Sequence, residues 1–269
     1  MSVGFTDALG GVHPSAGPHP RIVCLVPSIT ELLCDLGLTS ALVGRTGFCI
    51  HPRETLRAIP KVGGTKDVDL DKVRALRPTH VIVNVDENKR ETATALAAFV
   101  PQVIVTHPLT PQDNYALYRL LGGIFGVTAA AEKLCAALTE ALAVVGLGTP
   151  RPPRKVLYLI WQEPWMTVSP DTYISRTLAH FNWHTQPAEN TQRYPEIDLR
   201  EIVTRVDEVL LSTEPFPFQP RHVTETRALC GELPVRLIDG EMTSWYGSRA
   251  ILGLRYLASF TRLNSAVVA

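Results

Sequence analysis

The sequence has no excess of charge of either sign. Lys and Arg total 26, Asp and Glu total 26, and no basic run interrupts the 269 residues. Nucleic-acid-binding proteins need a basic surface to neutralise phosphates, so the charge balance argues against that class. No apolar run approaches the roughly 20 residues of a membrane-spanning helix. The segment 1–20 also lacks the basic and apolar regions of a signal peptide. A flexible leader and a cytoplasmic protein are therefore expected, or a periplasmic protein if the true start carries a leader.

Paired cysteines are also missing. The five cysteines form no CxxC motif and are odd in number. Free cysteine behaves as a small hydrophobe, and several of these lie in apolar segments. The pattern predicts free thiols in a reducing compartment rather than a disulfide scaffold.

Common catalytic motifs do not occur. The sequence has no GxSxG elbow, no phosphate-binding GxxxxGK[ST] loop and no HExxH helix. Three acidic residues, Glu163, Glu214 and Glu241, fall in predicted loops or loop edges, and carboxylates there are available for general acid–base work. A cofactor-remodelling enzyme is therefore one alternative. We interpret these carboxylates as hydrogen-bonding groups at the rim of a ligand site and predict that the protein is not an enzyme.

Short apolar runs alternate with helical segments over residues 21–106 and again over 151–269. This alternation is typical of α/β lobes with mainly parallel sheets. Residues 107–150 lack strand signals, and their Ala- and Leu-rich pattern predicts a long helix over 128–145. Ser28 and Glu31 have the spacing of a capping box, which predicts that Ser28 caps the first helix.

The two halves share a short similarity. The stretch VDLDKVRALRPTHVIVN over residues 68–84 resembles IDLREIVTRVDEVLLS over 197–212. Each predicts a helix with an aspartate before its first turn, followed by a turn and an apolar strand. The similarity suggests repeated lobes of the kind found in two-lobed binding proteins.

Ligands of parallel sheets bind beyond the carboxyl ends of the strands. In the second half these loops are aromatic and contain prolines, which favours a rigid apolar wall for a bulky ligand. Trp183 follows a helix and is expected to lie elsewhere. The strand-end positions predict these ligand-contacting residues: Pro27, Ser28, Phe48, His51, Gly64, Thr65, Asn84, Glu87, Trp161, Glu163, Trp165, Glu214, Phe216, Phe218, Glu241, Trp245 and Tyr246.

His51 is the one candidate metal ligand. Cys49 and His51 lie two residues apart, but two ligands do not make a structural metal site. The imidazole of His51 could instead ligate a metal already held in a macrocycle, and the alternative is a solvated loop histidine.

Two motifs resemble a known family. The segment IVCLVPSITELL from Ile22, together with VGGT from Val62 and DLDKVRALRPTHVIV from Asp69, resembles the substrate-binding proteins of cobalamin and iron–siderophore importers, also called helical backbone metal receptors. The likeness runs from about Arg21 to Phe260 and is nearest to the cobalamin-binding branch.

The resemblance implies two Rossmann-like lobes joined by a single long backbone helix, with the ligand in a cleft between the lobes. It implies cobalamin or another corrinoid as the bound ligand and no required cofactor. Haem and a ferric siderophore are the alternatives, and an anionic siderophore would need more cations than Arg45, Arg53 and Lys66. The chain is expected to be a monomer that acts as an importer component or an intracellular carrier or sensor.

The resemblance also implies docking on an ABC-type permease through one acidic residue in each lobe. Asp71 occupies the position in the N-terminal lobe. The position in the C-terminal lobe falls near Glu201, beside Arg200, whose charge has the opposite sign.

Overall fold

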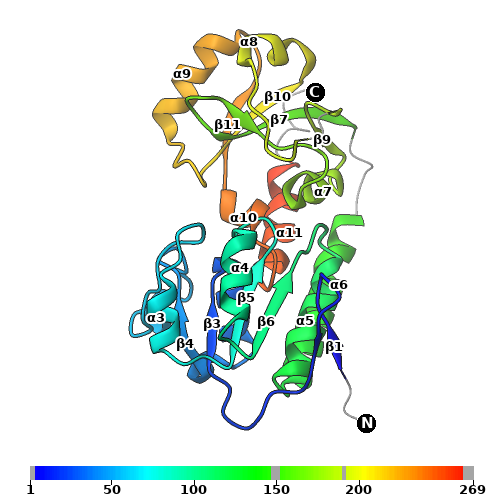
Figure 1. Cartoon of the computed structure of the whole chain (residues 1–269). Coiled ribbons are helices and arrows are strands. Elements are labelled where there is room, and N and C mark those ends of the chain that lie inside the picture. The colour runs from blue at the N-terminus through cyan, green and yellow to red at the C-terminus, as the bar shows by residue number, and fades with distance from the viewer. Residues whose placement is uncertain (1–3, 147–151, 190–191, 263–269) are drawn as a thin grey trace. The chain divides into compact units, whose positions relative to one another are not determined.

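The computed structural model describes residues 4–146, 152–189 and 192–262. The chain divides into two compact units (Figure 1). Unit 1 runs to Pro108 and includes Gln112–Leu138 and Tyr246–Arg249; unit 2 holds Leu109–Pro111, Thr139–Trp245 and the chain from Ala250. The expected boundary between residues 150 and 151 lies outside the described residues.

Unit 1 contains a four-stranded sheet in which every strand is parallel to its neighbours. The order is β4-β3-β5-β6. All residues of β3 and β5 are buried, as expected for Val- and Ile-rich strands covered on both faces by helices. The strands are β3 (Ile22–Cys24), β4 (Leu42–Arg45), β5 (His80–Asn84) and β6 (Gln102–Thr106).

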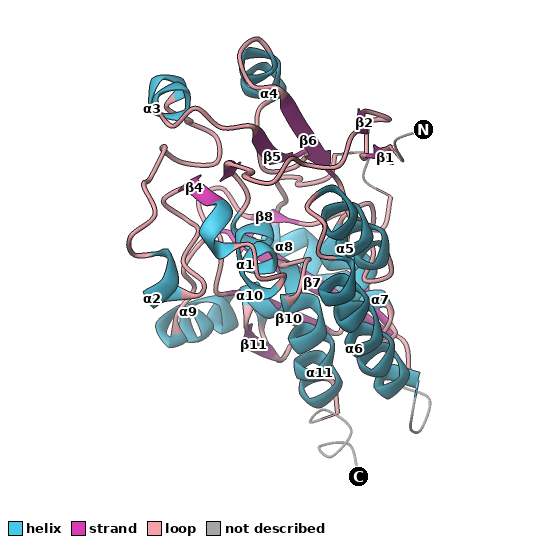
Figure 2. Ribbon diagram, turned by 90° about the horizontal axis from the view of Figure 1, so that it is seen from below, coloured by secondary structure: helices cyan, strands magenta, loops and turns pink. Residues whose placement is uncertain are grey.

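The helices of unit 1 connect these strands. Two of them, α5 and α6, lie side by side in Figures 1 and 2. A Cβ atom on Gly122 of α5 would come within 2.5 Å of the Ala131 Cβ of α6, so glycine permits this approach. The helices are α1 (Pro27–Asp35), α2 (Arg53–Leu56), α3 (Leu70–Ala75), α4 (Arg90–Ala97), α5 (Asp113–Ile124) and α6 (Thr128–Gly146), with a 3-10 turn at Thr39–Ala41.

The long helix predicted over 128–145 is confirmed as α6, and the division between the units falls within it, after Leu138. The predicted capping box is wrong. Helix α1 begins at Pro27, one residue before Ser28, because proline has the φ angle that the first helical position needs. The Glu31 carboxylate accepts instead from the Arg249 guanidinium at 2.6 and 2.8 Å.

The segment expected to be a flexible leader is packed from residue 4 onward. Strands β1 (Phe5–Thr6) and β2 (Val12–His13) form an antiparallel hairpin. The Asp7 carboxylate accepts from the Val105 amide and lies 3.0 Å from His13 Nε2. Although burial opposes ionisation, these hydrogen bonds lower the pKa of Asp7. Asp7 and His13 therefore fix the hairpin to β6.

Unit 2 is built on a second, mainly parallel sheet of order β11-β10-β7-β8, with β9 also paired to β7. Strand β8 is antiparallel to β7 and closes a tight hairpin with it. The mainly parallel α/β architecture expected from the sequence is thus confirmed. The strands are β7 (Arg154–Trp161), β8 (Met166–Thr167), β9 (Trp183–Thr185), β10 (Glu208–Ser212) and β11 (Val235–Ile238).

The helices of unit 2 include the counterpart of α3. The Asp69 side chain caps α3 by accepting from the Lys72 amide, and Asp198 caps α8 by accepting from the Arg200 amide. The similarity between 68–84 and 197–212 therefore has a structural basis, a capped short helix followed by a buried strand. The helices are α7 (Tyr173–Ala179), α8 (Leu199–Ile202), α9 (Pro220–Cys230), α10 (Gly240–Ser244) and α11 (Arg249–Phe260), with a 3-10 turn at Val203–Arg205.

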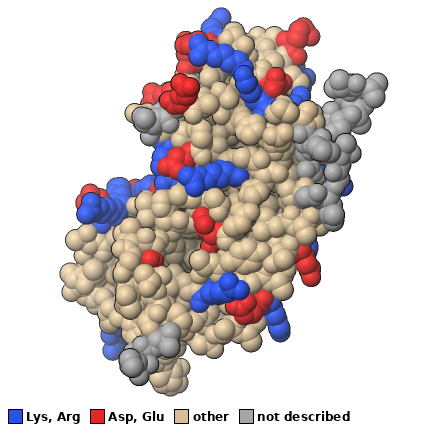
Figure 3. Space-filling view, turned by 90° about the vertical axis from the view of Figure 1, so that its right-hand side faces the viewer, with Lys and Arg blue, Asp and Glu red and all other residues tan. Residues whose placement is uncertain are grey.

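Among the described residues, no helix is both long and apolar enough to cross a membrane. Basic and acidic side chains are interspersed on the face drawn in Figure 3, in line with the balanced charge of the sequence.

Candidate ligand-binding site

The strand-end loops of unit 1 begin with two buried turns. Pro27 and Ser28 follow β3 and lie in the first turn of α1, both buried. Asn84 ends β5, where its side chain accepts from the Asp86 amide and donates to Thr106 Oγ1. The side-chain carboxamide of Asn84 thus fixes the turn that follows β5.

Glu87, in the loop after β5, is bound by Tyr246. The Tyr246 hydroxyl donates to Glu87 Oε1. Burial raises the pKa of Tyr246 well above its usual value, and the carboxylate of Glu87 adds to this rise. The phenol therefore stays a neutral donor over the physiological range. The sequence placed Tyr246 in the C-terminal lobe, whereas the structure packs it in unit 1.

The segment Tyr246–Arg249 is anchored in unit 1 at three points. The Gly247 amide donates to Asn114 Oδ1, and the Tyr118 hydroxyl donates to the Gly247 carbonyl. The ion pair between Arg249 and Glu31 completes the attachment. Sequence reasoning missed Asn114 and Tyr118, because helix α5 carries no sign of a partner more than a hundred residues away.

Phe48 and the Gly63–Thr65 turn lie in neighbouring loops. Phe48 is 63% exposed, a large apolar ring on the surface after β4. Gly64 faces this ring, since a Cβ atom there would lie 3.4 Å from Phe48 Cε2. The Thr65 carbonyl accepts from the side chain of Asn88, which fixes the turn against the β5 loop. Both loops leave apolar surface at the strand ends of unit 1.

His51 is half-buried and lines a pocket of about 710 Å³ together with Arg45, Arg53, Arg57 and other residues. No group of three or more His, Cys, Asp or Glu side chains positioned to hold a metal occurs within residues 4–146, 152–189 and 192–262. A role for His51 as an axial ligand would therefore require a metal that arrives already chelated.

The strand-end loops of unit 2 carry an aromatic cluster. Trp161 ends β7, is 40% exposed and meets the Phe216 ring edge to face with centroids 5.5 Å apart. Phe216 in turn packs on Phe218 at 4.6 Å. Phe218 is buried in the hydrophobic core, so its ring supports the surface pair rather than extending it. The exposed part of the cluster is thus the ring of Trp161, which rests on the partly buried ring of Phe216.

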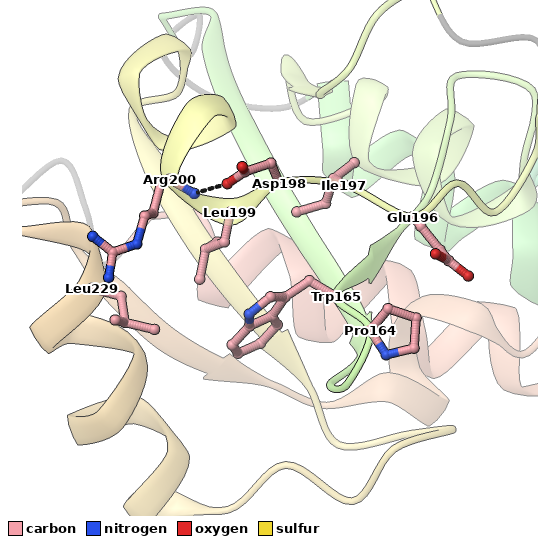
Figure 4. Close-up of a pocket in the computed structure, with 8 residues that line it drawn as sticks. All are labelled: Pro164, Trp165, Glu196, Ile197, Asp198, Leu199, Arg200 and Leu229. Atoms are coloured by element: carbon pink, nitrogen blue, oxygen red, sulfur yellow. Dashed lines mark hydrogen bonds between the residues drawn. The ribbon is translucent and has the colours of Figure 1, made fainter.

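Trp165 lies in a separate groove of unit 2 (Figure 4). Its ring stacks on Phe218 with centroids 6.3 Å apart. The groove has a volume of about 630 Å³ and brings Trp165 together with Leu199 of α8 and Leu229 of α9. No sequence signal connects these residues, because helices α8 and α9 converge only after folding.

Glu214 is a structural acceptor. Its Oε1 atom accepts from Ser244 Oγ and from Trp245 Nε1, each at 2.7 Å. Burial raises the pKa of Glu214, and the neighbouring Glu241 carboxylate adds to the rise, while the two hydrogen bonds act against it. Trp245 is itself buried. Glu214 and Trp245 therefore fasten the loop after β10 to α10.

The other two carboxylates singled out by the sequence lie apart from this arrangement. Glu163 is exposed at the tip of the β7–β8 hairpin with a φ of 62°. Glu241 is half-buried in the first turn of α10.

A buried hydroxyl network lies next to Glu214 and was not anticipated. The Tyr158 hydroxyl shares hydrogen bonds with Ser212 Oγ at 2.9 Å and with the Thr243 hydroxyl. Burial raises the pKa of Tyr158 far above its usual value. Gly240 allows the close packing, since a Cβ atom there would lie 2.6 Å from Ser212 Oγ.

Three further residues named from the sequence lie outside these loops. Trp183 is buried and packs edge to face on Phe260 inside unit 2. Asp71 is exposed in the first turn of α3. Glu201 is exposed on α8 and pairs with Arg205 at 2.8 Å.

The fold and a family match place the chain in a class of binding proteins. The family model described as "Periplasmic binding protein" matches residues 22–225, and the chain belongs to this family. Members of this family bind small molecules and work with ABC transporters. The expectation of a binding protein rather than an enzyme is confirmed by this membership.

Among characterised proteins, the chain is similar to vitamin B12-binding proteins. It is 21% identical to that of Vibrio parahaemolyticus over 197 residues, covering 73% of this chain and 71% of the relative. It is also 21% identical to that of Photorhabdus laumondii over 195 residues, covering 71% and 70%.

Solved structures share the fold. The periplasmic vitamin B12 binding protein BtuF of Vibrio cholerae superposes with a TM-score of 0.78 at 14% identity, covering 92% of this chain and 98% of that one. The periplasmic haem-binding protein HutB of Vibrio cholerae superposes with a TM-score of 0.73 at 19% identity, covering 90% and 98%.

Proposed function

We propose that this protein binds a corrinoid, cobalamin or a close relative, through the strand-end loops of its two units. The observation that carries the proposal is the exposed ring of Trp161 at the end of β7, which packs on the partly buried ring of Phe216. Large rings left on loops mark sites that a partner or ligand covers. The exposed ring of Phe48 in unit 1 supplies a second apolar surface of the same kind.

The chemistry of the loops suits a bulky ligand with a polar edge. Aromatic faces bury apolar area at low entropic cost, and the Phe216–Phe218 segment is further restricted by Pro215 and Pro217. Exposed Glu163 and half-buried Glu241 offer acceptors for amide side chains at such an edge. The similarity to two vitamin B12-binding proteins supports cobalamin within the ligand range of the family.

The decisive experiment is titration of the purified chain with cyanocobalamin. Calorimetry and the visible absorption spectrum measure the binding. Saturable binding at one site is expected. Cobinamide, haemin and a ferric hydroxamate serve as parallel ligands. If only haemin or the ferric siderophore saturates the chain, that compound is the ligand and the corrinoid is not. An absence of heat and spectral change with every corrinoid would refute the proposal.

We further propose that His51 contacts the metal face of the bound ligand. It follows β4, and Pro52 after it restricts its backbone. Only an imidazole nitrogen that carries no proton can ligate a metal, so acid should abolish such ligation. The spectra of the bound ligand are compared from neutral to mildly acidic pH for the native chain and for His51→Ala. Identical spectra at each pH would restrict His51 to the rim of the site.

We propose Asp71 and Glu201 as docking residues for an ABC-type permease. Asp71 is exposed in the first turn of α3, and Glu201 is exposed in the first turn of α8, one residue beyond the position that corresponds to Asp71. Co-purification of Asp71→Lys and Glu201→Lys variants with a candidate permease tests this, and undiminished recovery of both would exclude docking by these residues. The five free cysteines favour a reducing compartment, which cell fractionation measures directly.

A further inference from the structure

The pocket beside His51 has an unusual charge distribution. It is formed by the end of β4, helix α2 and the chain up to Lys61, all within unit 1. Four of its residues carry a permanent positive charge and only Glu54 carries a negative one. The cations are Arg45, Arg53, Arg57 and Lys61.

Arg45 is the central member of this set. Its side chain follows a buried strand, and the residue is only 6% exposed. The Nε atom donates to the Leu56 carbonyl at 3.0 Å, and Nη1 donates to the carbonyls of Thr46 and Cys49 at 3.1 and 3.0 Å. Three neutral acceptors thus orient the guanidinium but leave its charge without a counterion.

No carboxylate within the described chain forms an ion pair with Arg45. The Nη2 atom makes no hydrogen bond to a described residue, and the side chain lines the pocket. A buried charge without a partner is costly, and proteins retain one where a ligand supplies the opposite charge. The orientation of Arg45 therefore points to an anionic ligand.

The rim matches this inference. Arg53, Arg57 and Lys61 are exposed around the opening, and none of their side chains forms an ion pair with an acidic group in the described part of the chain. Lys66, which the sequence grouped with Arg45 and Arg53, is instead bound to the Asp86 carbonyl at 2.7 Å. A ligand in this pocket would meet cations from several directions.

We propose that this pocket is an oxyanion site that binds a phosphate group, with Arg45 as the buried anchor. A phosphate carries more charge and more acceptor oxygens than a carboxylate, which fits one planar guanidinium below and several flexible cations above. The inference does not require that a corrinoid binds, although His51 lines the same pocket. Its phosphate comes either from a free phosphate ion or from a phosphodiester within a larger ligand.

Binding of inorganic phosphate to the full chain is measured by calorimetry at constant ionic strength. Because Arg45 also holds three carbonyls, the test relies on the exposed rim. The double variant Arg57→Gln with Lys61→Gln should weaken phosphate binding about tenfold, since two charge-assisted contacts are lost. The matched control, Arg90→Gln with Lys133→Gln, removes two exposed charges of unit 1 elsewhere and should leave the affinity unchanged.

A third variant, Arg45→Lys, keeps the charge but removes the planar fork, and a melting curve verifies that it folds. Loss of phosphate binding in the folded variant supports the proposal. Absence of saturable binding at about 10 mM phosphate, where even a millimolar site would fill, overturns it. Equal affinities in the rim and control variants overturn it as well.

The two sources are separated by repeating the titration with cyanocobalamin present, since that ligand contains a phosphodiester. Displacement of phosphate assigns the pocket to the larger ligand, whereas unchanged phosphate affinity assigns it to the free ion. If cobalamin does not bind at all, the phosphate titration still tests the oxyanion site. Failure of the corrinoid proposal is therefore distinguishable from failure of the phosphate proposal.

Discussion

Buried polar side chains at the strand ends are bound mainly to backbone groups of their own and neighbouring loops. Asn88 donates to the Thr65 carbonyl, and Arg45 donates to three carbonyls around its loop. Such contacts satisfy groups that would otherwise be costly to bury. They also fix the loops that present the exposed rings to solvent. Some of the polar residues that the sequence predicts as ligand contacts therefore hold the loops in place, and the others remain predicted ligand contacts.

His80 gives the stability of unit 1 a dependence on pH. Burial, with the nearby His13 adding to it, lowers the pKa of His80 from 6.5 to about 4. The folded state therefore holds the neutral imidazole, while the unfolded chain takes up a proton from about pH 6.5 downward. Stability should fall between pH 6.5 and 4 by up to about 3 kcal/mol relative to neutral pH. Urea denaturation of the native chain and of His80→Gln at several pH values measures this.

The control for this prediction is His184→Gln, because His184 is exposed on β9. Its pH profile should match that of the native chain. If the stability difference between the native chain and His80→Gln is the same at pH 7 and pH 4.5, His80 is not the titrating group.

Replacing Trp161 by alanine should weaken corrinoid binding while leaving the fold intact. The ring is partly exposed, so its removal costs little packing, whereas a buried contact with ligand is worth about 1–3 kcal/mol. Calorimetry with cyanocobalamin checks the affinity, and a melting curve checks the fold. Tyr194→Ala removes another partly exposed ring of unit 2 as the control. Equal affinities for both variants would show that Trp161 lies outside the site.

At the scale of elements, the same short unit is used twice. A capped helix and a buried strand follow one another as α3 and β5 and again as α8 and β10. In each case an aspartate side chain accepts from amides of the first helical turn, which would otherwise lack partners. Sequence similarity between the halves thus reflects a local requirement, a cap on a helix too short to be stable alone.

Asp198→Ala should lower the free energy of unfolding by about 1 kcal/mol, the usual loss for a helix cap. Asp198 accepts from the amides of Arg200 and Glu201, so the variant leaves both without this acceptor. Asp71→Ala is the matched control, because Asp71 lies in a first turn without serving as the cap. Its effect should stay within about 0.5 kcal/mol. Equal losses in the two variants would assign the effect to charge rather than capping.

At the scale of the whole molecule, ligand binding should stabilise the chain by mass action. Cobalamin at about 100 times its Kd adds roughly 2.7 kcal/mol if it binds the folded state alone. For a chain of this size that corresponds to a rise in Tm of about 5–10 °C. Differential scanning fluorimetry with cyanocobalamin measures the rise, with haemin as the comparison ligand. A Tm that does not move at saturating cobalamin would contradict corrinoid binding.

The sequence by itself determined the architecture. Val- and Ile-rich strands, alternating with capped helices, predicted the parallel sheets, and the Ala-rich run predicted helix α6. These features depend on periodicity, propensity and caps, which act over a few residues. Membership of the periplasmic binding protein family agrees with the resemblance of the VPSITELL and VGGT motifs. The positions of the strand-end loops could also be predicted, because parallel sheets present their carboxyl ends together.

Only the tertiary structure decided what the individual loop residues do. Phe218 and Trp245 became packing groups, Glu214 became the acceptor for the Trp245 indole, and Tyr246 joined unit 1. The pocket around Arg45 likewise appeared only when α2 and the chain after it brought Arg53, Arg57 and Lys61 beside the end of β4. These outcomes depend on which distant residues a side chain meets, and the free energy of a buried polar group is set by those partners rather than by its neighbours in sequence.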